Sequence, residues 1–246
     1  MSRYSVEALT ETARWATGLP GANIERSPQE EKAYLRWLTE RVLQEQTQVE
    51  IFFQNHSSEQ LTSLTPYSWF LQKDTYGMKT CQIASAINAL CFLELYNSRL
   101  HTEEAIIDAI SIVWSADGPT FARRFPKGLK VQHLVSVFNR IAPDAKLRRS
   151  NSVAEMLSAA YSGAAVMTPV NGSHEVLIPP GFHIRKGSED LEVQVADPLF
   201  SNARFIPVNQ LIRSEITTVS DRNLGHDENN VLIIERAPLG SPQPQP

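Results

Sequence analysis

The spacing of hydrophobic residues changes its period along the chain. Up to about residue 163, apolar side chains recur every three or four positions among polar ones, which indicates amphipathic helices. From residue 164 onward, short apolar runs rich in Val and Ile are separated by Gly, Pro, Asn and Asp, which is typical of strands joined by turns. Helices followed by strands predict an α+β fold with a mostly antiparallel sheet.

Residues 1–64 form a polar zone with two expected helices. The first covers residues 6–15, and the second begins at a capping-box pattern in which Ser27 is the N-cap and Glu30 lies three positions later. We expect the second helix to end near Phe53. Its apolar face is expected to consist of Tyr34, Leu35, Leu38, Val42 and Leu43. We interpret residues 1–64 as a helical N-terminal extension whose second helix is above all a packing helix. Blocking of a cleft, as by a pro-segment, and recruitment of a protein partner stay open as further tasks.

Residues 65–237 are expected to form the main domain. Its helices are expected at 83–95, 102–114, 131–141 and 153–161, and its strands at 164–170, 175–178, 191–195, 204–208 and 231–234. Gly118 and Pro119 interrupt the helical pattern after the second of these helices. Residues 238–246 are rich in proline, lack an apolar period and are expected to be disordered.

Composition narrows the class of protein. The chain has 246 residues, of which 42% are hydrophobic and 20% charged, as in an ordinary globular protein with a sizeable core. Its net charge of -4 gives no electrostatic basis for binding nucleic acid or an anionic membrane. The sequence shows neither a membrane span nor a signal-peptide pattern, so we expect a cytoplasmic protein; export by a signal-less route fits equally well.

The cysteine count and the missing motifs limit the candidate chemistry. Cys81 and Cys91 are the only cysteines, and on one helix their Cα atoms would lie about 15 Å apart, too far for a disulfide. The sequence contains neither Cys-x-x-Cys nor His-Glu-x-x-His, and it lacks a glycine-rich nucleotide loop. We therefore expect neither a metal nor a nucleotide cofactor.

Cys81 is a candidate nucleophile because of its position. It follows a Gly-containing loop, Tyr76 to Thr80, and begins an apolar helix. Backbone N–H groups and the helix dipole both favour the thiolate at such a place. The alternative interpretation is a small buried hydrophobic residue, the commoner role of a free cysteine. Cys91 lies in mid-helix among Leu and Phe residues, and we expect it to be part of the core.

His174 and Asp197 are the candidate base and its orienting carboxylate. His174 leads into one apolar strand, and Asp197 ends another, just before Pro198. If the two strands pair so that Ile178 faces Val193, His174 directly faces Asp197. A carboxylate in that position would hold the imidazole in one tautomer.

His183 competes with His174 for the role of base. A tight hairpin that pairs Lys186 with Leu191 would set His183 opposite Gln194. Asp197 would then lie on the other face of the sheet, because side chains alternate along a strand. This difference in face favours His174.

Three segments carry a family resemblance. Cys81-Gln-Ile-Ala-Ser85, the segment from Gly172 to Phe182, and Val193-Gln-Val-Ala-Asp197-Pro198 resemble papain-like peptidases that process bacteriocin leaders at a double glycine. They are also similar to phytochelatin synthases. The resemblance spans about residues 70 to 236 and implies a papain-like fold. In that fold the nucleophile begins a helix that packs on a mostly antiparallel sheet, with Cys, His and Asp in this order.

The chain departs from the family pattern in three places. Gln82 stands where the family has glycine, and Ser173 is inserted before the histidine. The family also supplies an oxyanion-hole glutamine five or six residues before the nucleophile, whereas Gln72 lies nine before Cys81. A longer loop is needed for Gln72 to take that role, and Gln82 is the less suitable substitute.

The resemblance implies a cysteine peptidase or isopeptidase that acts on a peptide or protein substrate through a thioester acyl-enzyme. Cys81 would be the nucleophile, His174 the base, Asp197 its orienting group and Gln72 an oxyanion donor. Two alternatives stay open: an acyltransferase or transpeptidase of the phytochelatin-synthase type, and a catalytically silent papain-like binding module.

Overall fold

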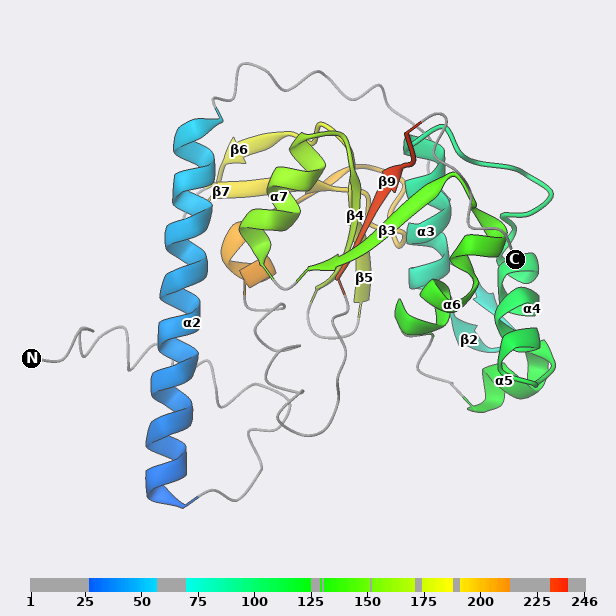
Figure 1. The fold of residues 1–246 in the computed structure, drawn as a ribbon, viewed down its shortest axis with the longest axis horizontal. Helices are drawn as coiled ribbons and strands as arrows, with labels where there is room; N and C mark the ends of the chain where they lie inside the picture. The colour runs from blue at the N-terminus through cyan, green and yellow to red at the C-terminus, as the bar shows by residue number, and fades with distance from the viewer. Residues whose placement is uncertain are drawn as a thin grey trace, which may run out of the picture.

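The computed structural model describes residues 27–56, 70–124, 129, 131–150, 152–170, 174–187, 191–212 and 231–238. The expected helix at residues 6–15 lies outside these ranges, as does the Pro-rich tail beyond residue 238. The described part is an α+β structure (Figure 1), as the change of hydrophobic period predicts. No helix within these ranges is long and apolar enough to cross a membrane.

The long helix α2, Pro28–Asn55, begins where the capping box predicts. The Ser27 hydroxyl accepts from the Glu30 backbone N–H, and the Glu30 carboxylate accepts in return from the Ser27 N–H. Its fully buried positions differ from the expected apolar face: they are Leu38, Thr39, Glu45, Val49 and Phe52. Leu38 is common to both sets, and Tyr34, Leu35 and Val42 are partly buried against the same core, so the expected face is confirmed in part. Glu45 could not be predicted from an apolar pattern, because its buried side chain is a carboxylate.

Glu45 joins α2 to the start of another helix, α7, Val153–Tyr161. One carboxylate oxygen of Glu45 accepts from the Val153 backbone N–H at 2.9 Å, and the other lies 3.0 Å from the Arg41 guanidinium. Val153 is the first residue of α7, where backbone N–H groups have no partner within the helix. A carboxylate from α2 therefore supplements the Ser152 N-cap that the sequence predicts.

The central sheet has four antiparallel strands in the order β3-β9-β4-β5. Their bounds are β3 Ala145–Ser150, β9 Val231–Arg236, β4 Ala165–Val170 and β5 His174–Ile178. A second antiparallel sheet has the order β6-β7-β8, with β6 Ile184–Lys186, β7 Leu191–Val195 and β8 Arg204–Pro207. One bridge, between Leu177 of β5 and Ala196, connects the two sheets.

The helices cover both faces of the central sheet (Figure 1). One face carries α3 Cys81–Phe92, α4 Glu103–Val113 and α6 Val131–Ile141, and the other carries α7 and α2. A short helix, α5 Gly118–Arg124, begins at the Gly-Pro pair where the sequence predicts only a break. Proline is well tolerated in the first turn of a helix, so this pair starts α5 as well as ending the previous pattern.

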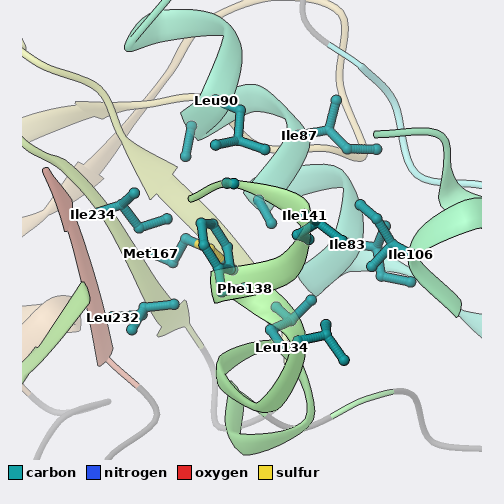
Figure 2. Packing of buried hydrophobic residues seen from close by; sticks show 14 of the residues in the cluster. Ile83, Ile87, Leu90, Ile106, Leu134, Phe138, Ile141, Met167, Leu232 and Ile234 are labelled. Carbon is teal, nitrogen blue, oxygen red and sulfur yellow. The ribbon is translucent and has the colours of Figure 1, made fainter. Parts of the chain in front are cut away.

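Each face of the sheet has its own apolar core. Figure 2 shows the first, in which Ile83, Ile87 and Leu90 of α3 pack with α6 side chains and with Met167, Leu232 and Ile234 of the sheet. Val166, Ile178, Val231 and Ile233 belong to the second core, with Leu38, Val49 and Phe52 of α2. The strands thus send alternate side chains to opposite faces, which is why they read as continuous apolar runs.

Candidate active site

Cys81 is the first residue of α3, as the sequence predicts. The residue before it, Thr80, is fixed by its side chain: the hydroxyl donates to Glu103 Oε1 at 2.9 Å and lies close to the Lys73 carbonyl. The α3 helix packs directly on β5. The nucleophile candidate is therefore held between a fixed loop and a core helix, with 7% of its surface exposed.

His174 is the first residue of β5, and its imidazole lies near enough to Cys81 to lower the pKa of the thiol. Its Nε2 lies 2.7 Å from Asp197 Oδ1. Since a carboxylate only accepts, Nε2 carries the proton in that contact and Nδ1 is the nitrogen left for the thiol. The structure thus brings together Cys81, His174 and Asp197, the three residues predicted from the sequence.

The strand pairing that we expected between His174 and Asp197 is wrong in register. The bridge pairs Leu177 with Ala196, so the same register sets Asp197 opposite Val176, two positions beyond His174. Val193 cannot pair with β5, because β6 and β8 occupy both edges of β7. A shift of two residues keeps the side-chain face, so Asp197 still meets the imidazole, diagonally instead of directly.

The β6–β7 hairpin that was considered for the competing His183 is the one that forms. Lys186 pairs with Leu191, and the Gln194 N–H donates to the His183 carbonyl at 2.9 Å. The imidazole that bonds to Asp197 is that of His174. The competing histidine therefore lies in the position that the hairpin register predicts for it.

Asp197 is almost completely buried, with 1% of its surface exposed, and both of its oxygens are bonded. Oδ1 accepts from His174 and from the Leu199 N–H at 3.0 Å, and Oδ2 accepts from the Arg204 guanidinium at 2.9 Å. Burial alone would raise the pKa of Asp197, but the hydrogen bonds from His174 and Leu199, the charge of His174 and the bond from Arg204 lower it overall. The carboxylate is ionised at neutral pH.

The pKa of the Cys81 thiol is lowered and the pKa of the His174 imidazole is raised. Burial works against the charged form of both groups, yet the pKa of Cys81 is lowered by hydrogen bonds from His174 and from the Glu175 and Gln82 N–H groups, and by the charge of His174. Burial also opposes the change at His174, whose pKa rises to about 9 through its bonds to Asp197 and Cys81 and the charges of both partners. These shifts favour a thiolate–imidazolium pair.

Gln72 reaches the site through a hairpin that the sequence analysis did not expect. Strands β1 Asp74–Thr75 and β2 Met78–Lys79 pair across a turn at Tyr76 and Gly77, whose φ angles are +55° and +75°. Two positive φ values are typical of a type I′ turn, which joins strands through two residues. The pairing of Asp74 with Lys79 brings the segment before β1 back beside the start of α3, where the Lys73 N–H donates to Thr80 Oγ1. The segment between Gln72 and Cys81 therefore folds back on itself as a hairpin, which shortens the distance that its nine residues would otherwise span.

Two further contacts hold Gln72 beside the candidate triad. Its backbone N–H donates to the Pro198 carbonyl at 2.8 Å, next to Asp197, and the Lys73 N–H donates to Thr80 Oγ1 at 3.2 Å. The side-chain oxygens of Gln72 and Gln82 are both buried without a hydrogen-bond partner. These oxygens are acceptors, so an oxyanion would have to be bound by the NH2 group of the same amide.

Glu175, which follows His174 directly, was not predicted as a site residue. This side chain is 2% exposed, its Oε1 has no hydrogen-bond partner, and its carbonyl accepts from Ser85 Oγ at 3.3 Å. Burial and the charge of Cys81 raise the pKa of Glu175 well above its usual value, while the charge of His174 works the other way. Burial therefore favours the neutral form of its carboxyl. A glutamate inside an apolar strand was the available signal.

In the residue ranges given above, no cluster of three or more His, Cys, Asp or Glu side chains could hold a metal ion. The groups that gather are instead a thiol, an imidazole and a buried carboxylate in one chain of contacts. Such a chain can form a nucleophile and move a proton. No family model, curated protein sequence or solved structure matches this chain.

Proposed function

We propose that this chain is a papain-like cysteine hydrolase that cleaves a peptide or isopeptide bond. The observation that carries the proposal is the contact chain from Cys81 through His174 to Asp197. A base that is oriented by a third group, beside a thiol at a helix start, is the arrangement that activates a nucleophile. The helix α3 packed on an antiparallel sheet that supplies His174 agrees with the papain-like resemblance.

The reaction begins with attack of the Cys81 thiolate on the substrate carbonyl carbon, which forms a tetrahedral oxyanion. His174, as imidazolium, then gives its proton to the leaving amine as the C–N bond breaks, and a thioester remains on Cys81. Neutral His174 next takes a proton from water, which attacks the thioester and releases the acid product. Asp197 keeps Nε2 protonated throughout, so that Nδ1 faces the reacting atoms.

Gln72 and the Cys81 backbone N–H are the proposed oxyanion donors. The β1–β2 hairpin, which brings Gln72 back towards the start of α3, supports this assignment, as does its bond to the Pro198 carbonyl. A single oxyanion donor is worth about 3 kcal/mol of transition-state stabilisation. Gln72→Ala is therefore expected to slow acylation by about 100-fold and to leave the thiolate intact.

The low exposure of Cys81, 7%, is the observation that favours the alternative of a catalytically silent binding module. A substrate carbonyl needs access to the sulfur, and a thiol buried for packing would have none. Acyl transfer to an amine or thiol would use the same acyl-enzyme, with the acceptor replacing water in the second step.

Alkylation of the two cysteines by iodoacetamide between pH 5 and 10 tests the proposal. Peptide mass spectrometry assigns the label to Cys81 or Cys91, so each protein sample contains its own reference thiol. We expect Cys81 to react well below pH 8.5, where an ordinary thiol ionises, and His174→Gln to abolish this early reaction. Labelling of both thiols only in the alkaline range would contradict the proposal and support the silent module.

A further inference from the structure

Arg204 binds the side of Asp197 that faces away from His174. The guanidinium donates to Oδ2 at 2.9 Å, whereas the imidazole and the Leu199 N–H share Oδ1. The carboxylate is buried, while Arg204 is half-exposed. A buried carboxylate thus lies between two cationic groups, one on each oxygen.

Three contacts fix Arg204 in this place. It is the first residue of β8 and pairs with Val195 of β7, two residues before Asp197. Its guanidinium lies 4.3 Å from the centre of the Phe200 ring, within the range of a cation–π contact. The Phe200 N–H in turn donates to the Asp197 carbonyl at 3.0 Å. Backbone pairing, an aromatic ring and an ion pair therefore converge on one side chain.

We propose that Arg204 is a positioning residue for the Cys81–His174–Asp197 reaction: it holds the Asp197 carboxylate and offsets part of the negative charge that the imidazole meets. This inference rests on the proposed function. Arg204 touches neither the thiol nor the imidazole in any contact described above, so it acts through Asp197.

The offset matters because His174 has two opposite tasks. As an imidazolium it protonates the leaving group, and as a neutral base it must accept a proton from water when the thioester is hydrolysed. Asp197 and Cys81 both raise the pKa of His174, to about 9, and Glu175 adds no charge in the neutral form that burial favours. A cation on the far oxygen weakens the field of Asp197 at the ring and keeps the neutral form within reach.

The chain offers a matched control in Arg185. Its guanidinium also forms an ion pair, with Glu192 at 2.6 Å, and also lies over an aromatic ring, 4.0 Å from the centre of Phe205. The two side chains are comparably exposed, 57% for Arg185 and 48% for Arg204. Arg185 differs in one respect that matters: its carboxylate partner does not contact His174.

The test compares Arg204→Gln, Arg204→Lys and Arg185→Gln in the full chain. The imidazole of His174 is titrated by NMR in histidine-labelled protein, with its signal assigned through His174→Gln. We expect the midpoint to rise by about half a pH unit in Arg204→Gln, since a half-exposed charge is screened by water. Arg204→Lys keeps the cation and is expected to titrate near the wild type, and Arg185→Gln to titrate at the wild-type midpoint.

The second readout separates the two steps with p-nitrophenyl acetate, which acylates a thiolate and leaves a thioester. A rise of half a pH unit lowers the fraction of neutral imidazole about threefold, so hydrolysis of the acyl-enzyme should slow by that factor in Arg204→Gln while acylation changes less. An unchanged or lower midpoint in Arg204→Gln would overturn the inference and leave the proposed function standing. If Cys81 in His174→Gln is alkylated as fast as Cys81 in the wild type, the proposed function itself fails.

Discussion

The two ends of α3 carry the same side chain in opposite chemical states. Cys81 at the start has a lowered pKa, whereas burial raises the pKa of Cys91, near the other end, to about 11. Burial opposes ionisation at both ends, so burial does not distinguish them. The difference comes from donors: Cys81 meets an imidazole and two backbone N–H groups. A buried thiol becomes reactive when hydrogen-bond donors and a positive charge next to it stabilise the thiolate.

Replacing the imidazole should remove most of this difference. In His174→Gln, Cys81 keeps its burial and its backbone donors but loses the proton acceptor and the positive charge. Because an ordinary thiol is about 1% ionised two pH units below its pKa, we expect alkylation of Cys81 at pH 6.5 to fall by about 100-fold. The rate for Cys91 in the same sample serves as the reference and should not change.

Asp197→Asn should have a smaller effect on the same rate, about tenfold, because the thiol still faces an imidazole. The amide is neutral, so the pKa of His174 should fall from about 9 towards its ordinary value of 6.5. A raised pKa in the folded state stabilises the fold below pH 6.5, and this contribution is lost as the pH rises to about 9. The stability advantage of the wild type over Asp197→Asn, measured by urea unfolding, should therefore shrink over that range.

Glu175→Gln tests the buried neighbour of Cys81. Because burial favours the neutral form of the Glu175 carboxyl, we expect little change in alkylation of Cys81 at pH 7. Its raised pKa means that stability is lost as the pH rises above about 4.5, where the unfolded chain ionises. The variant should therefore melt a few degrees higher than the wild type at pH 7, with no gain at pH 4. A large loss of Cys81 reactivity would show that the acid form itself supports the thiolate.

Cys91→Ala should have the smallest effect and completes the comparison. Cys91 is half-buried beside the first core, so the loss of packing should cost at most about 1 kcal/mol. The pH profile of Cys81 alkylation should stay the same, as followed by mass spectrometry. A shift in that profile would mean that the two ends of α3 are coupled through the helix.

Local patterns predicted much of the fold. The capping box gave the start of α2, and the short turn gave the register of β6 with β7, because both depend on neighbouring residues. Strand β3 was missed since it carries two arginines and a lysine and is an edge strand, which needs no continuous apolar run. The register of β5 failed for a non-local reason, because β6 and β8 already occupy the two edges of β7.

The site shows the same division. Cys81 and His174 could be selected from their places at the starts of a helix and a strand, and Asp197 from the end of another strand. The route of Gln72 depends on the turn at Tyr76 and Gly77, which reads in sequence as an ordinary loop. Arg204 gave no signal, because its role depends on a fold-back between Asp197 and β8 that is visible only in three dimensions.

The hydrogen bond from the start of α7 to the Glu45 carboxylate of α2 has a consequence for proteolytic processing. Glu45 is inaccessible to solvent and accepts from the first N–H of α7, and Leu38, Val49 and Phe52 of the same helix lie in the second core. Removal of α2 would leave the Val153 N–H without its hydrogen-bond acceptor. It would also expose the apolar side chains of the second core to water. Removal of this helix would therefore damage the folded protein, so a maturation step that discards α2 does not fit its contacts.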